Sequence, residues 1–230
     1  MKRICVCVAL SLIALAAVKN KARAQGAAAV PGSIEGHVID DRSQPMRGAT
    51  VYAMSLNGLP EAAIQIETLT DELGRFHLAP VSPGTATVHA YKERDGYPDT
   101  AFAFFVTNPQ SVPTVSVSSG ATTSGVVVRL GPKGGWLTGS VLDAETKASV
   151  RDASFNLSRS DPPNISVSTG PVQENGQINL LVPSSIGMRL EVCAPHYHPW
   201  RFGGDQWQGP NGVIKVEPVG KFVLEIRLSQ

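Results

Sequence analysis

Short runs in which apolar and polar residues alternate dominate the chain after residue 33, and such runs predict β-strands. Arg75–Leu78, Thr85–Tyr91 and Phe222–Leu228 follow this pattern. Gly, Pro, Asn and Asp residues separate the runs, as turns between strands require. Residues 60–66 are the best helical candidate, and that segment is short. The pattern therefore predicts an all-β fold.

The same order of signals recurs roughly 100 residues further along the chain, which indicates an internal repeat. The matching pairs are residues 36–40 with 139–143, 48–52 with 152–156, 74–78 with 176–180, and 126–130 with 222–228. Residues 131–135 between the copies, Gly-Pro-Lys-Gly-Gly, are mostly turn formers and are typical of a domain boundary. Short strands separated by frequent turns favour a sandwich of about seven strands in each copy.

The most specific motif of the first copy is Thr70-Asp71-Glu72-Leu73-Gly74-Arg75-Phe76. It stands in one order with Gly36-x-Val38-x-Asp40, Gln44-Pro45-Met46-Arg47-Gly48-Ala49-x-Val51, Pro83-Gly84-Thr85-Ala86-Thr87-Val88 and Gly96-Tyr97. These motifs resemble the carboxypeptidase regulatory-like domain, a transthyretin-like sandwich that is also described as a carbohydrate-binding-like fold. The resemblance implies a non-catalytic accessory domain, of the kind that accompanies peptidases, outer-membrane receptors and surface proteins.

The second copy matches these motifs more loosely. It keeps Gly139-x-Val141-x-Asp143 and Val150-Arg151-Asp152-Ala153, but Glu174-Asn175 precede Gly176 where the first copy has a Thr-Asp pair. We therefore expect two tandem Ig-like or transthyretin-like β-sandwich domains, the first at residues 33–131 and the second, divergent, at residues 135–230.

Residues 1–24 have the features of a secretory signal peptide. Two basic residues precede a mostly apolar, uncharged run at residues 4–18, which is short for a membrane span. Ala22-Arg23-Ala24 provides a small-x-small cleavage pattern. The basic residues close to it leave open another cleavage site or an uncleaved interfacial anchor. Residues 25–32 are predicted to be a linker. The rest of the chain is expected to be secreted or periplasmic, with no membrane span after cleavage.

Removal of residues 1–24 would change the charge of the chain. The full sequence has 20 basic and 19 acidic residues, and the signal holds five of the basic ones, which leaves 15 against 19, or −4. A nucleic-acid partner is not expected, because such proteins usually carry a basic excess. Cys193 would be the remaining cysteine, either as a small buried hydrophobic residue or in an intermolecular disulfide.

The residues for catalysis are not evident in the sequence. None of the five histidines has the Glu three residues on that a zinc carboxypeptidase site needs, and a Gly-x-Ser-x-Gly elbow is missing. We predict no catalytic residue, metal or cofactor. One alternative is a metal site in which His196 and His198 share a strand face and Asp205 completes the ligands. The plainer interpretation is a loop at a strand end.

A cluster of aromatic residues in the second copy is the candidate ligand site. It consists of Tyr197, Trp200, Phe202 and Trp207, together with Asp205. Flat rings on a glycine-rich loop can stack on sugar rings, and a carboxylate can meet their hydroxyl groups. The alternative is that the rings cap the open end of the second sandwich, because aromatic side chains dominate small cores.

Three functions remain open at this point. The leading hypothesis is a non-enzymatic binding or interaction protein of the cell envelope, with a polysaccharide or an envelope protein as partner. The second is a purely structural spacer or accessory subunit for an envelope protein. The third, a metal-dependent hydrolase that uses His196 and His198, is the weakest, because beyond Asp205 no spaced cysteine or second carboxylate completes the site.

Overall fold

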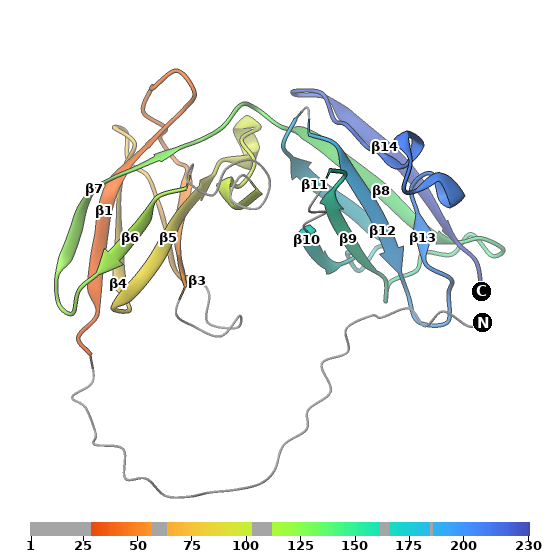
Figure 1. Ribbon diagram of the computed structural model, residues 1–230, viewed down its shortest axis with the longest axis horizontal. Helices are drawn as coiled ribbons and strands as arrows, with labels where there is room; N and C mark the ends of the chain where they lie inside the picture. Colours follow the sequence, from red (N-terminus) through yellow and green to blue (C-terminus); the bar gives the residue numbers. More distant parts are fainter. Residues whose placement is uncertain (1–28, 57–63, 103–111, 162–165, 185) are drawn as a thin grey trace, which may run out of the picture.

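The computed structural model describes residues 29–56, 64–102, 112–161, 166–184 and 186–230. They form two β-sandwiches that follow each other along the chain (Figure 1). The predicted signal peptide, and residues 25–28 of the predicted linker, lie outside the described residues. No helix within the described ranges is long and apolar enough to cross a membrane.

The first sandwich contains seven strands among the described residues. They are β1 (Gly32–Ile39), β2 (Thr50–Ser55), β3 (Ile64–Leu69), β4 (Arg75–Val81), β5 (Gly84–Tyr91), β6 (Thr114–Val117) and β7 (Thr122–Arg129). A three-stranded sheet has the order β4-β1-β7, and a four-stranded sheet has the order β3-β2-β5-β6. β1 begins at Gly32, the last residue of the predicted linker, and its pairing with β7 is parallel.

The second sandwich repeats this topology strand for strand. Its strands are β8 (Gly135–Asp143), β9 (Ser154–Arg159), β10 (Ser166–Pro171), β11 (Gln177–Val182), β12 (Met188–Cys193), β13 (Trp200–Arg201) and β14 (Lys221–Leu228). The sheets have the orders β11-β8-β14 and β10-β9-β12-β13, and β8 pairs with β14 in parallel. The all-β fold and the two sandwiches of about seven strands are confirmed.

Alternation along the strands gives each sandwich its own core. In β8 the side chains of Leu137 and Val141 are fully buried, while the alternate positions Thr138 and Ser140 are partly exposed. Because successive side chains point to opposite faces, such a strand contributes one apolar row to the space between the sheets. Fully buried members of the first core include Ile34, Val38, Val51, Leu78, Val88 and Leu130, and those of the second include Leu157, Leu190, Ile214, Ile226 and Leu228.

The turns after β3 and β10 show which residues of the two copies correspond to each other. Val38 N–H donates to the Gly74 carbonyl at 2.8 Å, and Val141 N–H donates to the Gly176 carbonyl at 2.8 Å, which makes the two glycines equivalent. The residues four and three positions before Gly176 are Val172 and Gln173. The counterparts of Thr70-Asp71 are therefore Val172-Gln173. The sequence pattern had placed Glu174-Asn175 there.

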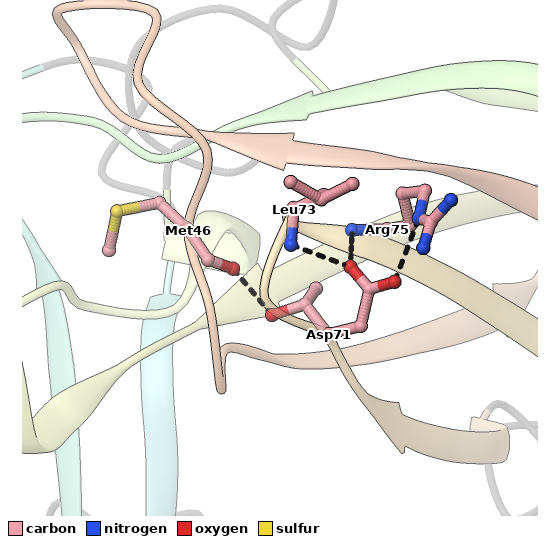
Figure 2. A network of polar contacts seen from close by, with 5 residues as sticks. Met46, Asp71, Leu73 and Arg75 are labelled. Carbon is pink, nitrogen blue, oxygen red and sulfur yellow. Dashed lines mark hydrogen bonds and ion pairs between the residues drawn. The ribbon is translucent and has the colours of Figure 1, made fainter.

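Asp71 shapes the turn of the first copy. Its Oδ1 accepts the backbone N–H groups of Leu73 and Arg75, both at 2.9 Å, and its Oδ2 accepts the Arg75 Nε–H at 2.7 Å (Figure 2). These donors lower the pKa of the Asp71 carboxyl, with the Arg75 backbone amide as the largest cause. Gly74 then takes a φ of +71°, where a β-carbon would lie 2.6 Å from the Val38 carbonyl oxygen. Only glycine fits there.

The predicted helix at residues 60–66 is wrong for its described part. β3 begins at Ile64 and pairs antiparallel with β2, so residues 64–66 are in a strand. Residues 60–63 lie outside the described residues. Pairing with β2 decides the conformation here, since tertiary context overrides a weak local helical preference.

The joint between the sandwiches is hydrogen-bonded on both sides. Gly134 N–H donates to the Gly96 carbonyl at 2.8 Å in the first domain, and the Gly134 carbonyl accepts Val219 N–H at 2.7 Å in the second. Ser184 Oγ donates to the Lys133 carbonyl at 3.0 Å. The segment predicted as a boundary is therefore a short connection whose backbone is tied to both domains.

We predict that Thr70→Val destabilises the first domain by about 1–3 kcal/mol, the usual cost of stranding buried polar groups. Thr70 is buried, and its Oγ1 accepts the Ala49 N–H at 2.9 Å and donates to the Met46 carbonyl. Valine has the same shape but leaves both backbone groups without this partner. Urea denaturation measures the change. Thr114→Val on the exposed surface of β6 is the control, and equal effects of the two substitutions would contradict the prediction.

Candidate ligand surface

Trp200 and Phe202 belong to the short strand β13 and the residue after it. Trp200 pairs with Val192 of β12, and Phe202 N–H donates to the Leu190 carbonyl at 3.1 Å. Both rings are partly buried and pack against the second core. The Phe202 ring meets the Phe222 ring edge to face at 5.8 Å between centroids. Both rings therefore contribute to packing around the second core, in line with the alternative in which aromatic rings cap the open end of the sandwich.

Trp207 lies beyond these rings, in the loop formed by residues 203–212. This loop holds two short 3₁₀ helices, Gly204–Gln206 and Pro210–Gly212. The Trp207 ring is partly exposed, and two guanidinium groups lie near its face, those of Arg189 at 5.8 Å and Arg201 at 5.5 Å from the centroid. Such cation–π contacts hold an indole in place. Asp205 is exposed in the first of the two helices.

Arg189 fixes the conformation of the 203–212 loop. Its side chain projects from β12 and is 8% exposed. Nη1 donates to the carbonyls of Trp207 and, at 3.2 Å, Gly209, and Nη2 donates to the Gln208 carbonyl at 3.1 Å. A second Nη2 bond reaches the Ser160 carbonyl at 3.4 Å. A buried arginine is costly unless its donors are used, and here Nη1 and Nη2 bind the backbone of an exposed loop, while the buried Nε has no hydrogen-bond partner among the described residues.

Tyr197 lies away from this loop, in a separate polar cavity of about 420 Å³ at one end of the second sandwich. Its hydroxyl donates to Asp143 Oδ2 at 2.9 Å. Asp143 Oδ1 accepts the backbone N–H groups of Glu145 at 3.0 Å and Thr146 at 2.7 Å, and the Thr146 hydroxyl at 2.8 Å. These bonds, with the Thr146 amide first, lower the pKa of Asp143 to about 2. The bond to Asp143 is the main cause that raises the pKa of Tyr197.

The five predicted ligand residues therefore do not form one site. Trp200 and Phe202 pack on the core, Tyr197 lines the polar cavity, and Asp205 and Trp207 lie on the 203–212 loop. Ligand binding by these residues stays a prediction. Sequence reasoning missed Arg189, which holds the loop. Its one signal was a charged residue among the apolar residues of the alternating run Met188–Cys193.

The predicted metal alternative loses its geometric basis. His196 and His198 lie in the turn and the extended segment between β12 and β13, not on a strand, and His196 has a φ of +68°. Asp205 lies in the separate 3₁₀ helix. Within the described part of the chain, no three His, Cys, Asp or Glu side chains are grouped to hold a metal ion. The loop interpretation describes these residues correctly.

A buried polar cluster in the first domain contains the other strongly shifted groups. Tyr52 stacks on His89 across the β2–β5 pair, with 5.1 Å between centroids, and its hydroxyl donates to Asp99 Oδ2 at 2.8 Å. Burial lowers the pKa of His89 to about 4 and raises the pKa values of Tyr52 and Asp99. His89 Nε2 lies 2.8 Å from Thr87 Oγ1. His89 is thus neutral near pH 7, and the cluster is a structural network beneath the outer face of the sheet.

Comparison with known families assigns the first sandwich. The carboxypeptidase regulatory-like domain matches residues 33–131, which confirms the resemblance seen in the motifs of the first copy. The second sandwich, residues 135–228, has the same strand order but no family assignment. Among curated proteins, none matches the chain.

Solved structures, among them pilins, align with the chain at low identity. The Bacillus anthracis TIE protein aligns over 88% of this chain with 16% identity and a TM-score of 0.36, and the chain spans 34% of its length. Shaft pilin SpaA from Lactobacillus rhamnosus GG aligns over 87% of this chain and 98% of its own, with 12% identity and a TM-score of 0.34. A streptococcal ancillary pilin aligns over 87% and 62%, with 11% identity and a TM-score of 0.31.

Protonation of Asp143 should loosen the second domain in acid. A carboxyl group whose pKa is lowered on folding stabilises the fold at pH values above its unfolded pKa of about 4, and this contribution disappears as pH falls toward its folded pKa of about 2. Asp143→Asn should therefore be less stable than the parent at pH 7, and the gap should shrink between about pH 4 and pH 2. Thermal unfolding over this range tests it. A gap that is independent of pH would contradict the assignment.

Replacement of Arg189 should release the 203–212 loop. Methionine resembles the unbranched aliphatic part of arginine, so Arg189→Met keeps that part of the packing but removes the donors to the three loop carbonyls. We expect hydrogen exchange and proteolytic cleavage within residues 203–212 to accelerate by at least about tenfold, because local opening follows the loss of those bonds. Arg47→Met is the control, since Arg47 lies in the first domain and pairs on the surface with Glu72 at 2.8 Å. Equal protection in all three proteins would show that Arg189 does not hold the loop.

Proposed function

We propose that this chain is an exported, non-enzymatic binding protein of the cell envelope, and that its ligand surface is the 203–212 loop of the second domain. The observation that carries the proposal is the binding of three loop carbonyls by the buried Arg189. A loop that is held rigid before it meets a ligand loses less conformational entropy on binding.

Carbohydrate is the ligand class that we propose for this loop. Trp207 supplies a partly exposed ring, and the exposed side chains of Asp205, Gln206 and Asn211 lie beside it in the sequence of the loop. Sugars bind to proteins through apolar ring faces combined with hydrogen bonds from such groups. The assignment of the first domain to the carboxypeptidase regulatory-like family supports an accessory, non-catalytic role. The signal-like residues 1–24 support export.

A spacer or accessory subunit for another envelope protein is the second candidate function. The observation in its favour is the joint, in which Gly134 is hydrogen-bonded to Gly96 on one side and to Val219 on the other. A connection tied to both domains holds a partner surface at a set distance. This candidate predicts co-purification with an envelope protein and no retention on carbohydrate.

Retention on polysaccharides separates the two candidates. We expect the protein to bind members of a glycan array and to be retained on the matching insoluble polysaccharide. Trp207→Ala should reduce retention at least about tenfold, as the loss of one aromatic anchor commonly does.

The control for this experiment is Leu73→Ala, which removes an exposed apolar side chain from the first domain and should leave retention unchanged. Circular dichroism checks that both variants are folded. Absence of retention for the parent protein, or equal retention for Trp207→Ala, would exclude the carbohydrate site on this loop. Capture of a specific envelope protein in that case would favour the spacer.

A further inference from the structure

Within the part of the chain that the structure describes, β14, the last strand of the second domain, pairs with β8 on one side and with no strand on the other. It pairs with β8 without any break in register from Lys221 to Leu228, and it is the outer strand of the order β11-β8-β14 (Figure 1). An edge strand of this length presents unpaired backbone groups that favour pairing with another strand. Proteins usually protect such edges.

The corresponding strand of the first domain is protected in that way. β7 pairs with β1 through a shift in register, because Ile34 faces Thr123 while Gly36 faces Val126. The extra residue is accommodated beside Gly125, whose φ is +77°. Such a bulge twists an edge away from partners. In the second domain the residues equivalent to Thr123 and Val126 are Phe222 and Leu224. Only Val223 lies between them, so β14 has no bulge there.

The backbone direction identifies which residues of β14 face outward. The carbonyls of Gly220 and Leu228 accept N–H groups from Trp136 and Ala144, so even-numbered residues face β8. In a parallel pair both backbone groups of a residue point to the same side. The N–H and C=O groups of the odd-numbered residues therefore point away from the sheet. These residues are Lys221, Val223, Glu225 and Arg227, and their side chains are exposed.

We propose that two copies of this chain associate through their β14 edges as an antiparallel pair centred on Val223. In this register Val223, which is 68% exposed, faces the partner's Val223, and Lys221 faces the partner's Glu225. The pattern lysine–valine–glutamate at alternate positions is complementary to itself in antiparallel orientation. Two-fold symmetry then repeats each favourable contact, as an isologous interface requires.

Other antiparallel registers are less favourable. A centre at residue 224 places Lys221 opposite the partner's Arg227 twice, and a centre at Glu225 places two carboxylates opposite each other. Like charges directly opposite destabilise a strand pair. A centre at residue 226 needs the outward carbonyl of Ser229, which already accepts His198 N–H at 2.8 Å. The register centred on Val223 avoids these conflicts.

The pairing would also cover the partly exposed apolar side chains on the core-facing side of β14. Phe222 and Leu224 are only partly buried against the second core. In the proposed register, Phe222 of each copy would face Leu224 of the other copy. In this register three residue pairs are hydrogen-bonded pairs, in which the two residues exchange both backbone hydrogen bonds. They are 221 with 225, 223 with 223, and 225 with 221, which gives about six backbone hydrogen bonds. A strand-to-strand contact is smaller than the ~1,200 Å² of a stable interface, so we expect a dimer in roughly the micromolar range.

Charge substitutions test the register directly. Sedimentation velocity over about a hundredfold range of concentration should show a monomer–dimer equilibrium for the parent protein. Glu225→Lys and Lys221→Glu should each be monomeric, because they place like charges opposite each other at both ends of the contact. The double variant Lys221→Glu/Glu225→Lys should recover the dimer, and an equimolar mixture of the two single variants should form a heterodimer.

A backbone variant provides an independent arm. Val223→Pro removes an outward N–H that takes no part in the pairing with β8, so the monomer should fold while the dimer is lost. Val127→Pro at the exposed edge of β7 is the matched control and should keep the dimer. A parent protein that stays monomeric at all concentrations, or a dimer that survives Glu225→Lys and Val223→Pro, would overturn the proposal. These readouts do not involve carbohydrate and are independent of the proposed ligand.

Discussion

The parallel pairing of the first and last strands of each domain is the constraint on which the structure depends. β1 pairs with β7, and β8 pairs with β14, across most of the length of each domain. Closing such a long loop costs conformational entropy, which local contacts do not offset. Each sandwich is therefore complete only when its last strand has paired with its first. The same arrangement leaves the last strand of each domain at the outer edge of its three-stranded sheet.

The two domains share this framework while their side chains differ. Gly74 and Gly176 both have a positive φ, +71° and +77°, and each accepts a backbone hydrogen bond from the first strand of its domain. Thr70, which links two backbone groups in the first domain, has an apolar counterpart in Val172. The second domain has instead acquired the arginine that binds its loop. The first copy thus retains the family motifs, and the second carries the candidate ligand surface.

Much of the fold was predictable from the sequence because strands that are buried on one face show alternation. The runs at β4, β5 and β14 were identified in this way, and the repeat gave the two domains. The segment at β3 was not, since a short edge strand preceded by Glu61, Ala62 and Ala63 resembles a helix start in local preference. The candidate site was less predictable. Closeness in sequence suggested one aromatic site, but β13 and the turn before it send Tyr197 and Trp207 to different places.

The strand order also determines how the protein responds when its ends are pulled apart. Because β1 and β7 run in the same direction, the entry of the chain into the first domain and its exit lie at opposite ends of one strand pair, and β8 and β14 repeat this in the second domain. Tension along the chain would load the hydrogen bonds between these strands in shear, all together, and would not open them one after another. Because the connection between the domains is hydrogen-bonded to both of them, such tension would act on the two sandwiches in series.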